Sequence, residues 1–319
     1  MPDSSMIPER VGVDILMATY NGERFLEAQL ASLESQTHEQ WRLIVRDDGS
    51  TDATNEILGA FAARNPARVV RIRDERGRLG AGGSFATLLG VSTAEYGCFC
   101  DQDDVWRPDK IEMLLQVALA HAGAGRPLLV HSDLEVVDKD MRTMAASFWR
   151  HQFIRPERCL WSQLLVQNVV TGCACLFNAS LRRGALPVPS DAIMHDWWLA
   201  LVAASSGGTI CCVPDPLVRY RQHGANDTGA KKWDLAYMLR HAPEFFRRDA
   251  FRIKFRAYQR QAAVLARHPY EEIPGSVRDL LLAFSDLSRL SYADRVRFLW
   301  RHRVLKTGVL RNVALLARI

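Results

Sequence analysis

Residues 11–115 alternate between short apolar runs rich in β-branched and aromatic side chains and segments in which apolar side chains recur at helical spacing. VGVDILM (11–17), WRLIV (41–45) and YGCFC (96–100) have the composition of buried strands. FLEAQLASLESQ, which starts at residue 25, has the helical pattern. Strands and helices that alternate in this way form βαβ units, so this part of the chain predicts a mostly parallel sheet flanked by helices on both faces.

The rest of the chain continues this pattern and then changes to helix alone. Residues 128–138 read as a strand, 195–205 as a helix, and 214–229 as a short strand that leaves through a polar loop. Beyond residue 233 the patterns are helical to the end. We therefore expect an α/β domain at 1–232 and a helical, basic C-terminal region at 233–319.

Composition and cysteine usage predict a cytoplasmic protein. The chain has 319 residues, of which 48% are hydrophobic and 24% charged, as in ordinary globular proteins. Residues 1–10 lack the build of a secretory signal, and the stretch that comes closest to a membrane span, 197–213, is interrupted by SSGG. Six of the seven cysteines lie in strand-like, apolar surroundings with no CxxC pair, which favours buried free thiols in a reducing compartment.

The C-terminal region carries most of the positive charge. Residues 240–319 hold 17 Lys and Arg against 7 Asp and Glu, although the whole chain has a net charge of only +5. Within 290–319, Leu299, Trp300 and Val304 lie at helical spacing among arginines. Such a helix can bind an anionic membrane surface, here the inner face of the cytoplasmic membrane, or it can pack on the domain or on a second subunit. No motif for nucleic acid recognition is present.

Polar clusters follow three of the predicted strands. They are TYN at 19–21, DDGS at 47–50 and DQDD at 101–104. Ligands of parallel α/β sheets bind beyond the carboxyl ends of the strands, so we expect the three clusters to converge on one site.

The acidic clusters allow two interpretations each. Asp101 and Asp103 can together bind one hard cation that also binds a substrate phosphate, or Asp104 can simply open the helix after Pro108. In DDGS, a carboxylate can accept a hydrogen bond from a base or a ribose hydroxyl, or the segment can be an Asp-Gly turn that caps the next helix.

VDILMATYNGERFLEAQLASLESQ, LIVRDDGSTDAT and FCDQDDVWRPDKI, in this order and spacing, resemble the nucleotide-sugar-binding half of the family 2 glycosyltransferases. The resemblance implies the Rossmann-like GT-A fold. The later MHDWW and YRQHG segments are most similar to the rhamnosyltransferase-like branch that builds bacterial cell-surface polysaccharides such as O-antigen. This similarity implies transfer of a sugar from a dTDP- or UDP-type donor to a lipid-linked or polysaccharide acceptor. The sugar it implies is rhamnose or another deoxysugar.

The resemblance also implies roles for individual residues. Those matched to the donor site are Thr19, Tyr20, Asn21, Glu23, Asp47, Asp48, Gly80, Asp101, Gln102, Arg219, Arg221 and Gln222. The DxD element falls on Asp101 and Asp103 and, with His223, implies a Mn²⁺ or Mg²⁺ site. Asp196 matches the catalytic base of an inverting transfer, and the candidates on the acceptor side are Trp106, His195 and Trp197.

Asp196 and His223 also have plain alternatives, and the chain departs from the family in one loop. Asp196 can be an acidic helix cap, and His223 a hydrogen-bonded surface residue. Arg78 and Ser84 stand where the family usually has side-chain amides.

Other functions fit the sequence less well. GAGGSF lacks the last Gly of a dinucleotide-binding loop, which disfavours a nicotinamide-dependent dehydrogenase. A sugar-nucleotide nucleotidyltransferase needs a Gly-rich, basic loop after the first strand, where TYNGERF stands. A non-catalytic nucleotide-sugar-binding protein remains the other alternative.

Overall fold

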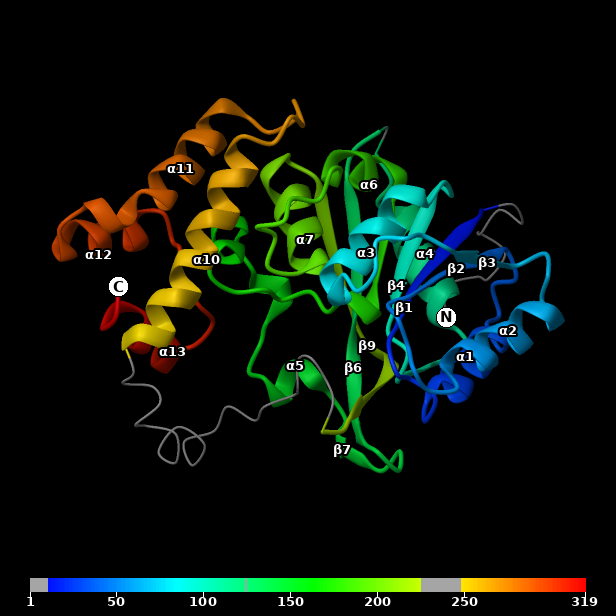
Figure 1. Cartoon of the computed structure of the whole chain (residues 1–319). Helices are drawn as coiled ribbons and strands as arrows, with labels where there is room; N and C mark the ends of the chain where they lie inside the picture. The colour runs from blue at the N-terminus through cyan, green and yellow to red at the C-terminus, as the bar shows by residue number, and fades with distance from the viewer. Residues whose placement is uncertain (1–10, 124, 225–247) are drawn as a thin grey trace.

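A computed structural model describes residues 11–123, 125–224 and 248–319, which form one nine-stranded sheet with helices on both faces (Figure 1). The strand order is β3-β2-β1-β4-β8-β6-β9-β5, and β7 pairs with β6. The strands are β1 (Val13–Thr19), β2 (Trp41–Asp47), β3 (Val69–Ile72), β4 (Tyr96–Cys100), β5 (Val105–Trp106), β6 (Leu128–Asp138), β7 (Thr143–Ala145), β8 (Cys175–Asn178) and β9 (Thr209–Gln222).

Two hydrophobic cores, one on each face of the sheet, hold the helices in place. The helices are α1 (Leu26–Glu34), α2 (Thr54–Arg64), α3 (Gly80–Val91), α4 (Lys110–Ala120), α5 (Phe148–His151), α6 (Ala179–Ala185), α7 (His195–Ser205), α10 (Arg248–Ala266), α11 (Gly275–Ser285), α12 (Tyr292–Arg301) and α13 (Val309–Leu316). Helices α1, α2 and α4 bury apolar side chains against one face, and α3, α6 and α7 against the other. The side chains of successive strand residues alternate between the two cores, as in Ile15 and Leu16.

The first four strands are parallel, as the sequence predicts. Their register aligns the carboxyl ends, with Thr19 opposite Asp47 and Met17 opposite Cys100. The other half of the sheet is mixed, because β8 lies antiparallel between β4 and β6. The expected short strand at 214–229 is part of a longer one, β9, which begins at Thr209 and pairs in parallel with β6 through two register shifts.

The C-terminal helices extend the core on the α7 face (Figure 1). Phe255 and Phe284 belong to the same buried cluster as Trp198 of α7. The boundary expected at residues 232 and 233 lies outside the described residues. Among the helices that the structure describes, none has the length and hydrophobicity needed to cross a bilayer.

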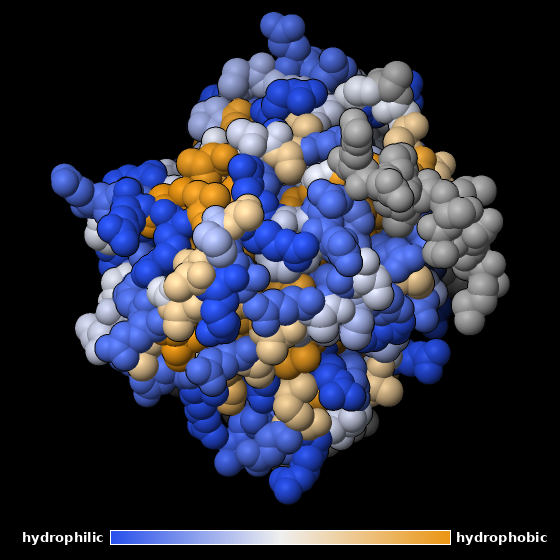
Figure 2. Space-filling view, turned by 90° about the vertical axis from the view of Figure 1, so that its right-hand side faces the viewer, coloured by the Kyte–Doolittle hydropathy of each residue, from blue (hydrophilic) through white to orange (hydrophobic). Residues whose placement is uncertain are grey.

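The hydropathy of the surface and the state of the cysteines are those of a globular protein. The face on the right of Figure 1 is covered mainly by hydrophilic side chains, with small hydrophobic patches between them (Figure 2). All seven cysteines are free thiols. Four of them, Cys98, Cys100, Cys173 and Cys175, are buried, as expected, whereas Cys211 and Cys212 are only partly buried.

Candidate active site

The ends of β1 and β2 are joined by a hydrogen-bonded carboxylate. Thr19 Oγ1 donates to Asp47 Oδ1 at 2.8 Å, and Ser50 and Asn55 donate to the same carboxyl group. Burial raises the pKa of Asp47, but the hydrogen bonds from Ser50, Thr19 and Asn55 outweigh it, so its pKa lies below the ordinary value. Asp47 is therefore ionised at neutral pH, with its position fixed by neighbouring side chains.

The loop after β1 is fixed by contacts to its main chain. The amide of Gln102 accepts from Tyr20 N and donates to Tyr20 O, both at 2.9 Å. A Cβ at Gly22 would lie 2.3 Å from Gln102 Oε1, so a larger residue there would displace the Gln102 amide from Tyr20. Asn21 and Glu23 accept hydrogen bonds from backbone N–H groups at the start of α2. The loop is thus shaped by the side chains of Gln102, Asn21 and Glu23, whose oxygens accept hydrogen bonds from neighbouring backbone N–H groups.

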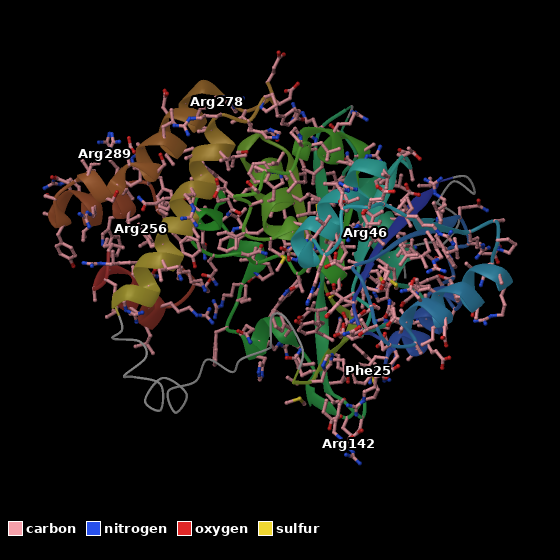
Figure 3. The ribbon with its side chains drawn as sticks, in the orientation of Figure 1. Phe25, Arg46, Arg142, Arg256, Arg278 and Arg289 are labelled. Atoms are coloured by element: carbon pink, nitrogen blue, oxygen red, sulfur yellow. The ribbon has the colours of Figure 1, made fainter. Side chains whose placement is uncertain are left out.

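Asp48 lies inside the protein, which argues against the direct contact with a donor that the resemblance implies. Its carboxylate is paired with Arg46 and accepts hydrogen bonds from Leu79 N and Gly80 N, each at 2.7 Å. Ser84 donates to the same group. Arg46 lies in the interior (Figure 3). Because Asp48 and the Gly80 N–H are used in fixing the start of α3, neither suits direct contact with a ligand.

Arg78 and Ser84, which stand where the family usually has side-chain amides, lie in different surroundings. Ser84 is part of the buried Arg46 network. The Arg78 guanidinium lies 3.9 Å from the centre of the Tyr20 ring, at the rim of the loop. A cation stacked on an aromatic ring stabilises the position of both groups, so Arg78 holds the Tyr20 ring in place.

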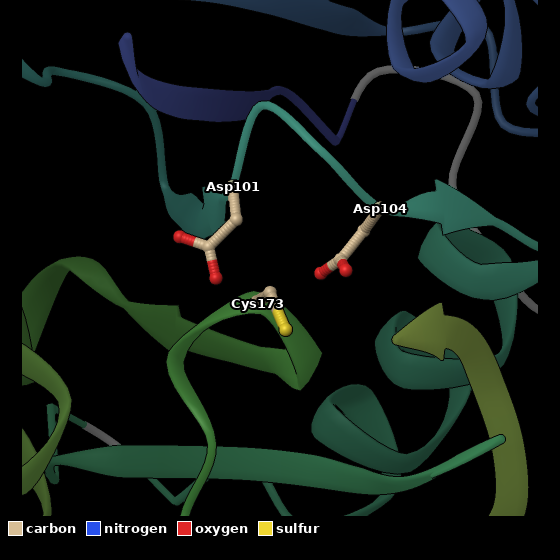
Figure 4. Close-up of side chains that lie close together, drawn as sticks. All are labelled: Asp101, Asp104 and Cys173. Carbon is tan, nitrogen blue, oxygen red and sulfur yellow. The ribbon is translucent and has the colours of Figure 1, made fainter. Parts of the chain in front are cut away.

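The acidic cluster after β4 divides into two parts. Asp101 and Asp104 face Cys173, and one ligand atom of each lies within 4.8 Å of the other two (Figure 4). Asp104 does not open the helix: it is fully buried, its Oδ2 has no hydrogen-bond partner among the described residues, and α4 begins later, at Lys110. Asp103 is placed differently, with Oδ2 at 2.7 Å from His223 Nε2.

Burial and mutual repulsion raise the pKa values in this cluster. Burial, followed by the charges of Asp103 and Asp196, raises the pKa of Asp101 to about 7. Burial and the charges of Asp103 and Asp101 raise the pKa of Asp104 well above its ordinary value. A bound cation would lower both, so the cluster has the electrostatics of a cation site.

The end of β9 reaches this cluster because β9 pairs with β5 in antiparallel register, Arg219 opposite Val105. Arg221 is buried, donates to the carbonyl of Asp103 at 2.7 Å, and stacks on the Phe25 ring. Gln222 is half-buried, and exposed Arg219 forms an ion pair with Glu135. The register therefore brings His223 to Asp103, and the Arg221 side chain holds the loop that carries the acidic cluster.

Asp196 lies at the start of α7 and close to the acidic cluster. Its carboxylate accepts hydrogen bonds from Gly172 N at 3.0 Å and Trp197 N at 2.6 Å. The N-cap position of α7 is occupied by Met194, so Asp196 does not have the cap position of the plain alternative. Burial raises the pKa of Asp196 to about 6. A carboxyl group with this pKa is ionised at neutral pH and able to take a proton.

The three candidates on the acceptor side are buried, which argues against direct contact with an acceptor. The Trp106 ring packs against Lys110. His195 is stacked on Phe85, with ring centroids 4.0 Å apart, and Trp197 donates from Nε1 to Leu164 O. All three are less than a tenth exposed, so they fill the core and do not line an open surface. The sequence contains no signal that tells whether an aromatic side chain beside a polar motif lies in the core or at the surface.

The residues present fit a divalent cation. Asp101, Asp103 and Asp104 offer carboxylate oxygens, which Mg²⁺ and Mn²⁺ prefer, and His223 offers an imidazole nitrogen, which suits Mn²⁺. The unpartnered Asp104 Oδ2 is a buried acceptor that a cation would satisfy. The predicted triad of Asp101, Asp103 and His223 does not form one group within the part of the chain that the structure describes, because Asp103 pairs with His223 while Asp101 faces Asp104.

Solved structures of the GT-A fold share the architecture of this chain. A mannosyltransferase of Pyrobaculum calidifontis, in complex with GDP-Man and Mn²⁺, aligns over 99% of this chain and 81% of its own, with a TM-score of 0.56 and 19% identity. TarS of S. aureus, in complex with UDP-GlcNAc, aligns over 87% of this chain and 73% of its own, with a TM-score of 0.57 and 16% identity.

Residues 14–183 match Glycosyl transferase family 2, and the chain belongs to this family. A dTDP-rhamnosyl transferase of Shigella flexneri is 28% identical over 230 residues, 67% of this chain and 74% of its own length. A β-1,3-glucosyltransferase of Escherichia coli, which uses UDP-Glc and a GlcNAc-diphosphoundecaprenol, is 27% identical over 63% of this chain and 73% of its own. The protein is thus an enzyme, a glycosyltransferase, as the sequence predicts.

Proposed function

We propose that the protein is a metal-dependent, inverting glycosyltransferase that moves a sugar from a nucleoside diphosphate donor to a lipid-linked or polysaccharide acceptor in cell-surface glycan synthesis. The observation that carries this proposal is the meeting of Asp103 and His223, 2.7 Å apart, beside a second carboxyl group, Asp101, whose pKa is raised by burial and by the charges of Asp103 and Asp196. A cation site and a base in one place are what a glycosyl transfer with a diphosphate leaving group needs.

The donor nucleoside would lie at the ends of β1 and β2. Asp47 is ionised and held there, so it can accept hydrogen bonds from the base or the ribose, and Thr19, Tyr20 and Asn21 border it. Arg219 and Gln222 lie on either side of Arg221 near the end of β9, and they would contact the diphosphate. The Shigella relative's donor, dTDP-rhamnose, is the first one to test, with UDP-sugars next.

The metal would be held by Asp103 and His223 with Asp101 or Asp104. When bound, a Mn²⁺ or Mg²⁺ ion stabilises the negative charge that develops on the leaving diphosphate. The protein's own contribution is to hold these ligands: Arg221 fixes the loop at Asp103, and the strand register brings His223 to it.

Asp196 would act as the base. It would take the proton of the acceptor hydroxyl as the hydroxyl oxygen forms its bond to the anomeric carbon. The bond from that carbon to the diphosphate oxygen breaks, and the nucleoside diphosphate leaves. Attack from the face opposite the diphosphate inverts the configuration in one step.

A donor panel tests this function. We expect one nucleotide-sugar to raise the melting temperature of the full chain in the presence of Mn²⁺, and we expect mass analysis with a lipid-linked acceptor to detect addition of one sugar. Stabilisation by a donor without any transfer would favour the non-catalytic binding protein. Transfer of a nucleotidyl group to a sugar phosphate would favour the nucleotidyltransferase.

The catalytic part would be residues 1–232, and the C-terminal helices, part of 233–319, would bring the enzyme to its acceptor at an anionic membrane surface. Leu299 and Val304 are buried in the core, but Trp300, Val309 and Val313 are 59%, 78% and 59% exposed. Exposed apolar side chains among arginines are typical of helices that lie in a membrane interface. A contact with a second subunit would cover the same side chains.

We expect the full chain to co-sediment with phosphatidylglycerol vesicles at low salt and to be released as the salt concentration rises, because screening weakens the attraction of arginine to anionic lipid. Val309→Asp with Val313→Asp should remove binding. Met144→Asp, an equally exposed apolar residue on β7, is the matched control. Wild-type protein that stays in the supernatant, or that binds uncharged vesicles equally, would contradict membrane docking.

A further inference from the structure

A buried lysine lies directly behind the acidic cluster. Lys110, the first residue of α4, is fully buried. It shares the buried face of α4 with Leu114 and Ala118, four and eight residues further on. Its ammonium group lies 3.0 Å from the centre of the Trp106 ring and donates to the carbonyl of Cys173 at 2.6 Å. Burial of an ammonium group is unfavourable in free energy unless its partners are well placed, so these two contacts fix the position of the Lys110 ammonium group.

The carbonyl that Lys110 holds belongs to the short turn η4 (Gly172–Ala174), which lies between the two halves of the site. On one side, Cys173 Sγ faces Asp101 and Asp104. On the other, Gly172 N donates to Asp196 Oδ2 at 3.0 Å. The turn is tightly enclosed, because a Cβ at Gly172 would lie 2.9 Å from His195 Nε2. A shift of η4 would therefore move the Asp196 carboxylate relative to the acidic cluster.

We propose that Lys110 is a positioning residue: by holding the Cys173 carbonyl, it fixes η4 and, through the Gly172 N–H, the Asp196 carboxylate relative to Asp101. This inference rests on the proposed role of Asp196 as the base. Lys110 touches neither substrate, and its effect would appear in turnover and not in donor binding. A misplacement of about 1 Å can cost about 100-fold in rate, so a single hydrogen bond to this turn can matter.

Three variants of the full chain test the proposal. Lys110→Met removes the ammonium group and keeps most of the volume of the side chain. Lys110→Gln removes the charge and retains a donor for the Cys173 carbonyl. Lys139→Met, in which the lost ammonium group is exposed on the surface, is the matched control for charge. The readouts are kcat, the dissociation constant of UDP or dTDP with Mn²⁺, and hydrogen exchange of the backbone amides of residues 171–174.

We expect Lys110→Met to lower kcat by about 10- to 100-fold while the dissociation constant changes less than about threefold, and to speed exchange at Gly172. Lys110→Gln should recover most of kcat, and Lys139→Met should behave as wild type. Unchanged kcat and exchange in Lys110→Met would overturn the proposal. So would a parallel loss of kcat, nucleotide binding and melting temperature in both Lys110 variants, which would mean a general role in folding.

The exchange measurement separates this inference from the proposed function. A wild-type chain that transfers no sugar would refute the function, whereas slow exchange at Gly172 in wild type that becomes fast in Lys110→Met would still support the link from Lys110 to η4. An active wild type with an equally active Lys110→Met would refute only the inference.

Discussion

Asp196→Asn is expected to lower turnover by about 100- to 10,000-fold, the range that general-base catalysis supplies, and to leave binding of the nucleotide-sugar close to wild type. The reason is that the Asn side chain cannot take the proton of the acceptor hydroxyl. Because burial raises the pKa of Asp196 to about 6, wild-type kcat should rise with pH through about 6 and then level off. The residual activity of the variant should lack this dependence. Single-turnover kinetics across pH, with donor affinity measured by calorimetry, are the readouts.

The Asp196 variant needs a structural control. Both carboxylate oxygens accept hydrogen bonds from backbone N–H groups, of Gly172 and Trp197, and Asn has only one acceptor oxygen to offer them. The melting temperature must therefore be measured as well. Asp191→Asn, which removes an exposed carboxylate just upstream, should leave turnover unchanged. Donor affinity that falls in step with kcat in Asp196→Asn would place Asp196 in the donor site and contradict its role as base.

Asp103→Ala should cost about 1000-fold in kcat/KM, equivalent to about 4 kcal/mol of transition-state stabilisation, because a divalent cation contributes several kcal/mol at a developing charge. In the Asp103→Ala variant, Mn²⁺ should no longer increase the affinity for the donor. His223→Ala, which removes the imidazole whose Nε2 lies 2.7 Å from Asp103 Oδ2, should act in the same direction.

The control for Asp103 is Asp140→Ala, which removes an exposed carboxylate that forms ion pairs with Lys139 and Arg142. It should match wild type, because surface ion pairs contribute little to stability and Asp140 is outside the cluster. If Asp103→Ala retains full activity that EDTA still abolishes, the ion is held elsewhere, and Asp101 with Asp104 becomes the remaining candidate.

The first half of the fold could be predicted because its signals are local. Apolar runs and helical spacing identify β1, β2, β4 and their helices, and the parallel arrangement follows from the alternation. The position of β8 between β4 and β6 could not be predicted, because strand pairing is a long-range property that no residue pattern specifies. The full extent of β9 was not predicted either, since the strand was expected to begin at Pro214, whereas it begins at Thr209 and shifts register at the prolines Pro214 and Pro216.

The same limit applies to the site. Convergence of Thr19 and Asp47 follows from parallel strands of matched length, and the structure joins them. Asp48 points into the protein because it pairs with Arg46, a charged residue of β2. Other partners of Arg46, such as the Gly77 carbonyl, lie far along the chain. Lys110 is buried on the same face of α4 as Leu114 and Ala118, although a lysine at a helix start is ordinarily exposed. Charged residues that pair inside the protein are therefore what sequence patterns miss.

Titration calorimetry of UDP and dTDP into the full chain, first with Mn²⁺ and then with EDTA, tests most directly whether the cluster at the carboxyl ends of the strands binds a nucleoside diphosphate through a cation. We predict that at least one of the two binds with 1:1 stoichiometry in Mn²⁺, and that binding is weakened at least about tenfold, equivalent to about 1.4 kcal/mol, in EDTA. Equal binding with and without the metal, or no binding of either nucleotide, would contradict the account.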